Sequence, residues 1–544
     1  MACSKIFSGD LPEITSEIIE HLRNDFSTLY SCILVNRLLC RTAIPLLWEN
    51  PFSIPTQNCH FIEIYLHYLN ESDKTKLDEI GFNNNLIPSN PLFNYPNFIK
   101  CLNTFRMVFF IEKWTVRAIS TYKKTNNSYP YSSAINFKKF SKLIYSSLFN
   151  IFINNEVQLN NFETEIITDK NFEFFENVIE IILQNPNFIY NIKNLKLHII
   201  CNISDVNLSK INSFLTFISS NCNNISSLYL RFQNMFIKTF SHIINSQQNL
   251  QKISFSCNIV PLHLLLSLKN SNYSNTLKTI VFYSVDFKNT INLTEVFEQL
   301  NVLESIHILY CHSLNSIFVQ QIINLSKPFK LKSLFASEVF HIESFQLLLQ
   351  KSGDYLENIG FESLTNSNEL LLLITTYCTK ISIFELRGLD NQNTLSALNL
   401  IKNVSLNLTC LFIDNYSNYD DLSSIILRNL GKILPSRLEY LNLSFKIKLD
   451  DFKIFLKDSQ NIFIKRLLIR NRMFKERVNI LPYIKEYIMK NRRVEYLAID
   501  EILNTDKKEL FSLKDEVKEF GLYNIKVQSY DNLNICCYKY IRDI

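Results

Sequence analysis

Cysteine and histidine are the residues in this chain that could support nucleophilic or metal chemistry. Cys311 lies near His307 and His312, and an imidazole can activate a neighbouring thiol as a nucleophile. The nine histidines are otherwise isolated, and no HExxH, CxxC or other Cys/His ligand spacing occurs. Cys311 also falls at a regular position of the repeat described below, which favours a buried structural thiol. We therefore expect no catalytic residue, no metal site and no cofactor.

A cluster of basic residues is the second candidate for chemistry. The segment IKRLLIRNRMFKERV, residues 464–478, carries six lysines and arginines. Arg466 and Arg470 would share one face of a strand, where two guanidinium groups could receive an acidic or phosphorylated segment. A solvated basic edge is the alternative interpretation.

The composition excludes several function classes. The 544 residues include 56 Lys+Arg and 51 Asp+Glu, and this net charge of +5 indicates neither a nucleic-acid partner nor a membrane partner. The 7 glycines form no GxGxxG or GxxxxGK[ST] loop, so familiar nucleotide chemistry is not expected. No apolar run approaches the length of about 18 residues that spans a bilayer. The 13 scattered cysteines and the lack of a secretion signal predict reduced thiols in the cytoplasm and/or nucleus.

A repeat organises most of the chain. Apolar residues at positions one, four and six of a short segment recur twelve times, and successive first positions lie 25 to 33 residues apart. The twelve segments begin at Ile192, Ile225, Leu250, Leu277, Leu303, Leu331, Leu356, Ile381, Leu408, Leu438, Ile464 and Val494. Each segment alternates as a half-buried strand does, and a stretch with helical periodicity follows it.

One strand and one helix per 25 to 30 residues resembles the leucine-rich repeat family in its longer, helix-containing form. The resemblance covers about residues 192–500 and implies an α/β fold in which units stack into a curved solenoid, with the strands on the concave side. The family's Asn or Cys, eight residues after the first apolar position, occurs only as Asn258 and Cys311. An irregular stack of strand and helix pairs with another topology is the alternative.

The N-terminal segment has a different pattern. Leu11, Ile14, Ile18, Ile19 and Leu22 share one face of a helix, in which Pro12 takes the first position. Two further short helices are expected before Trp48. Three such helices can form a small bundle that is marginally stable by itself.

This segment resembles the F-box. The matching anchors are Leu11-Pro12, Ile18-Ile19, Leu22, Leu29, Val35-Asn36-Arg37, Cys40 and Leu47-Trp48. The resemblance implies binding to a Skp-family adaptor, through the contacts Leu11, Pro12, Ile18, Leu29 and Trp48, with the first four partly exposed. The alternative is a helical cap that covers the first repeats.

We therefore expect an F-box protein with C-terminal leucine-rich repeats of the fungal type. The expected domains are an F-box at residues 1–55, a helical connector with irregular capping repeats at 56–190, a leucine-rich-repeat solenoid at 191–520, and a C-terminal cap at 521–544.

The strand residues between the apolar positions would face the concave surface, where aromatic and Arg side chains act as binding anchors. The expected substrate contacts are Tyr229, Arg231, Tyr283, His307, Phe335, Arg387, Phe412, Tyr440, Arg466, Arg470 and Tyr496.

The two resemblances together imply a substrate-recognition adaptor of an SCF-type (cullin-RING) ubiquitin ligase, which directs a protein substrate to proteasomal degradation. Such a chain is not itself an enzyme, because the ligase partners supply the chemistry and the adaptor supplies proximity. The alternative is a leucine-rich-repeat scaffold or inhibitor that binds a protein partner without ubiquitin ligase linkage. An enzyme with an unrecognised cleft in the solenoid is a third, more distant interpretation.

Overall fold

A computed structural model describes residues 12–53, 59–79, 91–125, 134–200, 205–232, 236–256, 262–269, 273–288, 290–337, 341–364, 368–415, 420–473, 478–503, 506–535 and 541. The chain forms two compact units, unit 1 (residues 1–253) and unit 2 (residues 254–544).

Unit 1 begins with three helices, α2 (Pro12–Glu20), α3 (Phe26–Ile33) and α4 (Arg37–Leu47). Local capping explains where α3 and α4 start. The carboxylate of Asp25 accepts a hydrogen bond from the backbone N–H of Thr28, and the side-chain oxygen of Asn36 accepts one from Leu39. Three helices were predicted here, and three are present.

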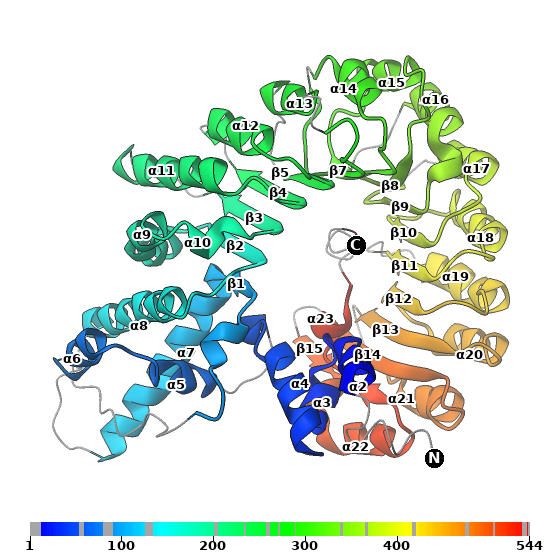
Figure 1. The fold of residues 1–544 in the computed structure, drawn as a ribbon. Helices are drawn as coiled ribbons and strands as arrows, with labels where there is room; N and C mark the ends of the chain where they lie inside the picture. Colours follow the sequence, from blue (N-terminus) through cyan, green and yellow to red (C-terminus); the bar gives the residue numbers. More distant parts are fainter. Residues whose placement is uncertain are drawn as a thin grey trace. The chain divides into compact units, whose positions relative to one another are not determined.

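The rest of unit 1 combines helices with a short parallel sheet (Figure 1). Its elements are η1 (Pro51–Ser53), α5 (Phe61–Leu66), α6 (Glu71–Glu79), η3 (Tyr95–Phe98), β1 (Cys101–Asn103), α7 (Thr104–Thr125), α8 (Ala134–Asn154), β2 (Asn161–Ile166), α9 (Asp169–Leu183), α10 (Asn187–Tyr190), β3 (Asn194–Ile199), α11 (Asp205–Asn221), β4 (Ser227–Phe232) and α12 (Ile237–Asn245). Strands β1 and β2 precede the first repeat found in the sequence; they pair in parallel with each other, and β2 pairs in parallel with β3. The strand and helix alternation therefore begins earlier than residue 191.

Strand β5 (Lys252–Ser256) spans the boundary between the units, and unit 2 continues with regular alternation. Its helices and strands are α13 (Leu262–Ser267), β6 (Thr279–Tyr283), α14 (Leu293–Gln299), β7 (Ser305–Cys311), α15 (Ser316–Ile323), β8 (Leu331–Ala336), α16 (Ile342–Ser352), η5 (Gly353–Tyr355), β9 (Asn358–Phe361), α17 (Asn368–Tyr377), β10 (Ile383–Arg387), α18 (Thr394–Asn403), β11 (Cys410–Asp414), α19 (Asp420–Ile433), β12 (Tyr440–Phe445), α20 (Leu449–Asp458), β13 (Ile464–Met473), α21 (Leu481–Ile484), η6 (Lys485–Met489) and β14 (Val494–Leu503).

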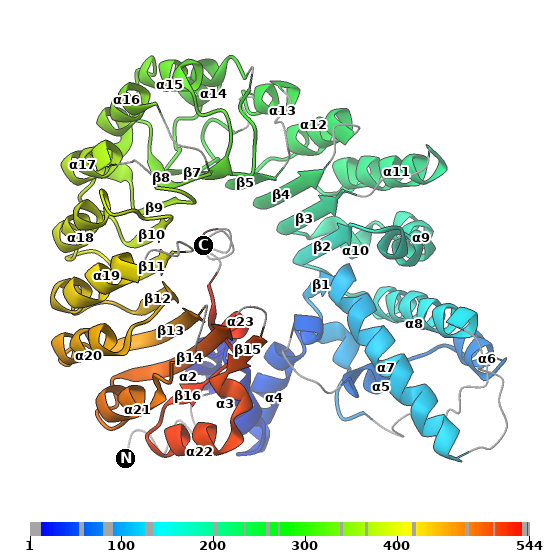
Figure 2. The same ribbon diagram turned by 180° about the vertical axis from the view of Figure 1, so that it is seen from behind.

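The apolar repeat positions align across the unit 2 sheet. Phe384 is in register with Leu411, which is in register with Leu441, and the row continues through Leu467 and Leu497. All these strand pairs are parallel, and the helices that follow the strands form a row on the outer side of the sheet (Figures 1 and 2). The predicted α/β architecture of stacked strand and helix units is confirmed.

The C-terminal end of unit 2 departs from the repeat. Strand β15 (Asp506–Glu509) pairs antiparallel with β14, and η7 (Leu510–Ser512) and α22 (Lys514–Leu522) follow. Strand β16 (Lys526–Val527) then pairs in parallel with β14. The short helix α23 (Tyr530–Leu533) is the last helix or strand among the described residues. The predicted cap at residues 521–544 thus includes the strand β16, which pairs at the sheet edge, and the separate helix α23.

Close packing on the unit 2 sheet requires glycine at position 360. A Cβ added to Gly360 would lie 2.5 Å from Cδ1 of Phe335 and 2.8 Å from Cβ of Glu385. Since Phe335 is fully buried, the ring has little room to move. We predict that Gly360→Ala lowers the free energy of unfolding by about 1–3 kcal/mol, measured by urea denaturation.

Gly521→Ala is the matched control, because a Cβ at Gly521 in α22 meets no atom within 4 Å. This change should be neutral or stabilising by up to about 1 kcal/mol. Equal effects of the two substitutions would contradict the packing account.

Candidate protein-binding surfaces

The N-terminal bundle has its own small core. Ile19, Leu29, Leu39 and Ala43 are buried together, and Leu22, Cys32, Ile33, Leu46 and Leu47 pack against them. Other large apolar side chains of the bundle point to solvent: Ile14 and Ile18 are each 42% exposed, Tyr30 61%, Leu34 73% and Val35 64%. Ile14 and Ile18 are one helical turn apart on α2, so they form one exposed face. Exposed apolar side chains gathered on a small bundle are typical of protein-binding sites.

The five predicted adaptor contacts have different environments. Leu11 lies outside the described residues, and Pro12 and Ile18 are exposed as expected. Leu29 is fully buried in the bundle core, so the expectation of an exposed contact is wrong at this position. Trp48 packs within the chain, with its ring centroid 5.3 Å from that of Tyr65 and 4.2 Å from that of Tyr95.

The bundle is joined to the first strand of unit 1 by hydrogen bonds as well as by the chain. The carbonyl oxygen of Glu49 accepts hydrogen bonds from the backbone N–H groups of Lys100 and Cys101, at 3.0 and 3.1 Å. The carboxylate of Glu49 also pairs with Arg23 at 2.7 Å. Burial raises the pKa of Glu49, and Arg23 opposes this shift. Together with Trp48, these contacts attach the bundle to the rest of unit 1.

The second candidate surface is the inner face of unit 2, which we define as the sheet face on the side opposite the helices. Three rows of side chains cross it in register. The first row is Cys410, Tyr440, Arg466, Tyr496 and Lys526. The middle row is Phe335, Gly360, Glu385, Phe412, Asn442, Leu468 and Ala498. The third row is Arg387, Asp414, Ser444, Arg470 and Asp500.

The predicted substrate contacts lie on strands as expected, but several are covered. Tyr229 and Arg231 lie on β4 of unit 1, the first buried and the second half-buried. In unit 2, Tyr283, Arg387, Arg466, Arg470 and Tyr496 are half-buried, whereas His307, Phe335, Phe412 and Tyr440 are buried. The imidazole Nδ1 of His307 is 2.7 Å from the Ser333 hydroxyl, which accounts for a buried polar group. The sequence pattern identified the face but not what covers it.

A register shift in β7 positions Tyr310, a residue that the sequence pattern did not identify as part of this face. The pairing of β7 and β8 shifts register between Leu309 and Cys311, and Tyr310 has a φ of 53°. The Tyr310 hydroxyl donates a hydrogen bond of 3.0 Å to Glu385, which also pairs with Arg387. Burial alone would lower the pKa of Arg387, but the charge of Glu385 raises it overall. No local sequence signal marks the register shift that makes this contact possible.

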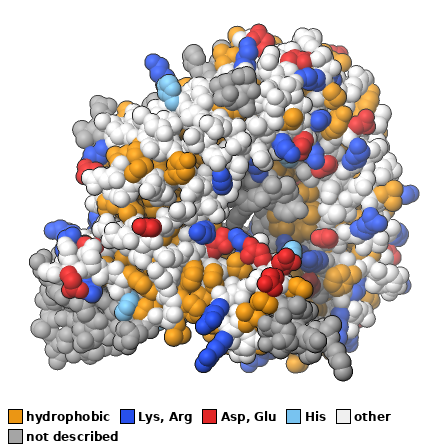
Figure 3. All heavy atoms as spheres, viewed as in Figure 1, with side chains coloured by type: hydrophobic (Ala, Val, Ile, Leu, Met, Phe, Trp, Pro, Cys, Tyr) orange, Lys and Arg blue, Asp and Glu red, His pale blue; other side chains and the backbone are white. Residues whose placement is uncertain are grey.

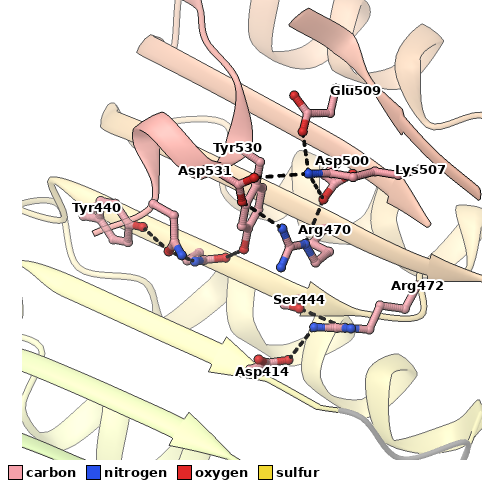
Figure 4. A network of polar contacts seen from close by, with 12 residues as sticks. Asp414, Tyr440, Ser444, Arg470, Arg472, Asp500, Lys507, Glu509, Tyr530 and Asp531 are labelled. Carbon is pink, nitrogen blue, oxygen red and sulfur yellow. Dashed lines mark hydrogen bonds and ion pairs between the residues drawn. The ribbon is translucent and has the colours of Figure 1, made fainter. Parts of the chain in front are cut away.

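The C-terminal segment covers the other end of the inner face. Tyr530, Leu533 and Ile541 belong to one buried cluster with residues of eight strands, and half-buried Ile535 packs against this cluster. The strand residues of this cluster include Phe412, Tyr440, Leu468 and Ala498. We name residues 528–535 the inner segment. Figure 4 shows α23 over the sheet, with the ring of Tyr530 close to Arg470.

Charged groups hold one side of the inner segment. The guanidinium carbon of Arg470 lies 3.8 Å from the ring centroid of Tyr530, and Arg470 Nε donates to Asp500 at 2.9 Å. The carboxylate of Asp531 lies 3.6 Å from Arg470 and 3.3 Å from Lys507 (Figure 4). Burial raises the pKa of Asp500, and Arg470 and Lys507 oppose this shift.

Arg466 does not join this charged group. Its guanidinium carbon lies 5.8 Å from the ring centroid of Tyr496, on the first row of the inner face. Arg472 instead lies beside the third row, where its Nε donates to Ser444 at 3.1 Å and its guanidinium is 3.5 Å from Asp414. The predicted pair of Arg466 and Arg470 is therefore replaced by Arg470 and Lys507 as the groups that receive a carboxylate.

Charge of one sign does not dominate the visible surface. Figure 3 shows basic and acidic side chains interspersed over the face that it presents. None of the helices in the described ranges combines the length and the apolar character that a membrane crossing requires.

The described structure gives the surroundings of Cys311 and of the candidate metal ligands. Cys311 is 1% exposed, and its thiol lies 3.5 Å from the carbonyl oxygen of Phe282, as a buried structural thiol would. Among the described residues, no three His, Cys, Asp or Glu side chains are placed to hold a metal ion.

Buried thiols generate a testable prediction. Burial raises the pKa of Cys222 to about 12 and that of Cys378 to about 12, from 9.0. This shift lowers the thiolate fraction about a thousandfold at pH 8, and the thiolate is the reactive form. We expect iodoacetamide to alkylate these two thiols at least about a hundredfold more slowly in the folded chain than in guanidinium-unfolded chain. Peptide mapping by mass spectrometry measures both rates, and rapid alkylation of folded Cys222 would contradict the assignment.

The chain matches no protein-family model, and no curated protein matches its sequence. The resemblances to the F-box and to leucine-rich repeats therefore stay predictions.

Proposed function

We propose that this chain is the substrate-recognition subunit of an SCF-type (cullin-RING) ubiquitin ligase. The N-terminal bundle binds a Skp-family adaptor, and the inner face of the repeat sheet binds the protein substrate. The observation that carries this proposal is that α2 has two faces: Ile19 is buried in the bundle core, whereas Ile14 and Ile18 are exposed.

The bundle has the features that an adaptor-binding module needs. Its core is formed by its own helices, so the exposed residues are not required to complete it. An apolar face that stays exposed in water gains free energy when a partner covers it. Trp48 packs on Tyr95 of η3, and the Glu49 carbonyl accepts hydrogen bonds from Lys100 and Cys101, so the bundle is attached to the rest of unit 1.

The inner face has the side chains that a protein substrate needs. It presents Tyr and Arg side chains between apolar positions, and these residue types dominate the energetics of protein interfaces. Binding both partners on one chain raises the effective concentration of a substrate lysine near the charged conjugating enzyme. This contribution to rate is entropic and requires no catalytic side chain from the chain itself.

The adaptor interface can be tested with full-length chain. We predict that Ile14→Asp combined with Ile18→Asp lowers capture of a Skp-family adaptor at least about tenfold, because each charge would be buried without a partner in the interface. Both positions are exposed in the free chain, so the free energy of unfolding should change by less than about 1 kcal/mol. Capture is measured by pull-down with purified adaptor, and stability by thermal unfolding.

Leu406→Asp is the matched control, because Leu406 is 80% exposed and lies far along the chain from the bundle. It should leave capture unchanged. If the folded parent chain captures no adaptor, the ligase proposal fails, and a scaffold or inhibitor without ubiquitin linkage becomes the better account.

A further inference from the structure

The inner segment is held on the sheet by side chains more than by backbone pairing. Among the described residues, its backbone makes one hydrogen bond to the backbone of a strand, from Gln528 N–H to the Leu497 carbonyl at 3.0 Å, at the end of β16. From Tyr530 onward it forms one helical turn, whose side chains contact strand side chains. A segment outside the strand ladder can leave without breaking the sheet.

The sheet contacts recognise particular chemical groups of the inner segment. The Tyr530 hydroxyl donates to Asn442 Oδ1 at 2.6 Å, and Asn442 Nδ2 donates to Asn534 Oδ1 at 3.1 Å. The Tyr440 hydroxyl also accepts a hydrogen bond from the backbone N–H of Ile535 at 3.1 Å. One strand, β12, therefore provides Tyr440 and Asn442 as a paired polar recognition site.

Charged side chains of the sheet also contact the inner segment. Arg470 stacks on the Tyr530 ring, while Asp531 faces the two cations Arg470 and Lys507. The Asp531 side chain is still 74% exposed, so its carboxylate lies at an open edge of the site. In contrast, Leu533 belongs to the buried apolar cluster and is 5% exposed. Tyr530 and Leu533 are three residues apart, which places both on one side of a helical turn.

Without the inner segment, this end of the sheet would expose a contiguous set of large apolar side chains. Phe412, Tyr440 and Leu468 are buried in the same cluster as the segment. An exposed surface of this kind needs an occupant in water. The occupant seen here shows which chemistry fits: an aromatic residue, an acidic residue next to it, an aliphatic residue three positions after the aromatic one, and Asn after that.

We propose that the inner face of unit 2 binds a partner protein segment with this pattern, and that residues 528–535 occupy the same site in competition with it. That the partner is a ubiquitination substrate rests on the proposed function. Binding of a segment at this site is independent of that function, because it can be measured without an adaptor.

The test uses full-length chain and a fluorescein-labelled peptide with the sequence of residues 528–535, QSYDNLNI. Tyr530→Ala combined with Asp531→Lys removes the stacked ring and reverses the charge that holds the segment. We expect this released variant to bind the peptide at least tenfold more tightly than the parent does, measured by fluorescence anisotropy. Adding Asn442→Ala to the released variant, or replacing Asp by Lys in the peptide, should each weaken binding at least tenfold.

Asp515→Lys, an equal change of charge at an exposed position in α22, is the control and should leave peptide binding at the parent level. A folded released variant that binds the peptide no better than the parent overturns the proposal and makes the segment a fixed part of the fold. Adaptor capture by the same variant is measured in parallel and should be unchanged, so loss of the adaptor interface and loss of this site are distinguished.

Hydrogen exchange of the parent chain covers the case in which the released variant does not fold. Excess unlabelled peptide should accelerate amide exchange in residues 530–535 at least threefold and leave strands β12 and β13 unchanged. Exchange in residues 530–535 that is as slow as in these strands, and insensitive to the peptide, overturns the competition.

Discussion

The structure depends on the alignment of apolar side chains from one strand to the next. A single strand and helix unit has too little surface to bury its apolar face, so each unit is stable only against its neighbours. In unit 2 the alignment of Phe384, Leu411, Leu441, Leu467 and Leu497 provides this contact. Because strand side chains alternate, fixing these residues toward the helices also fixes which residues form the inner face. The arrangement of the inner face is thus a consequence of the packing of the core.

The sequence predicted this part of the fold because the alignment depends on local periodicity. The apolar triplets marked the strands of unit 2, and alternation placed Phe412, Tyr440 and Arg470 on the correct face. The spacing also predicted three helices before Trp48. The early strands β1 and β2 were harder to recognise, since Cys101–Asn103 is very short and long helices separate it from β2.

The state of the candidate sites could not be predicted, because it depends on contacts between distant residues. Leu29 is an apolar helix residue like Ile18, and only the packing of α3 against α4 determines that it is buried. Tyr440 is covered by a segment that lies about ninety residues later, and the sequence of that segment has no repeat pattern. The register shift at Tyr310 likewise has no local cause in composition. Periodicity therefore identifies faces, and long-range packing determines which parts of them are open.

The last strands of unit 2 also bear on whether further strands can add to the edge of the sheet. Strand β14 is ten residues long, and an uncovered strand of that length offers backbone donors and acceptors to any other strand. Here the antiparallel β15 and the two-residue β16 pair with it, and β15 carries Lys507 and Lys508. Short, charged strands at a sheet edge discourage further strand addition. The departure from the repeat at this end thus limits growth into fibres, a hazard that every stack of parallel strands carries.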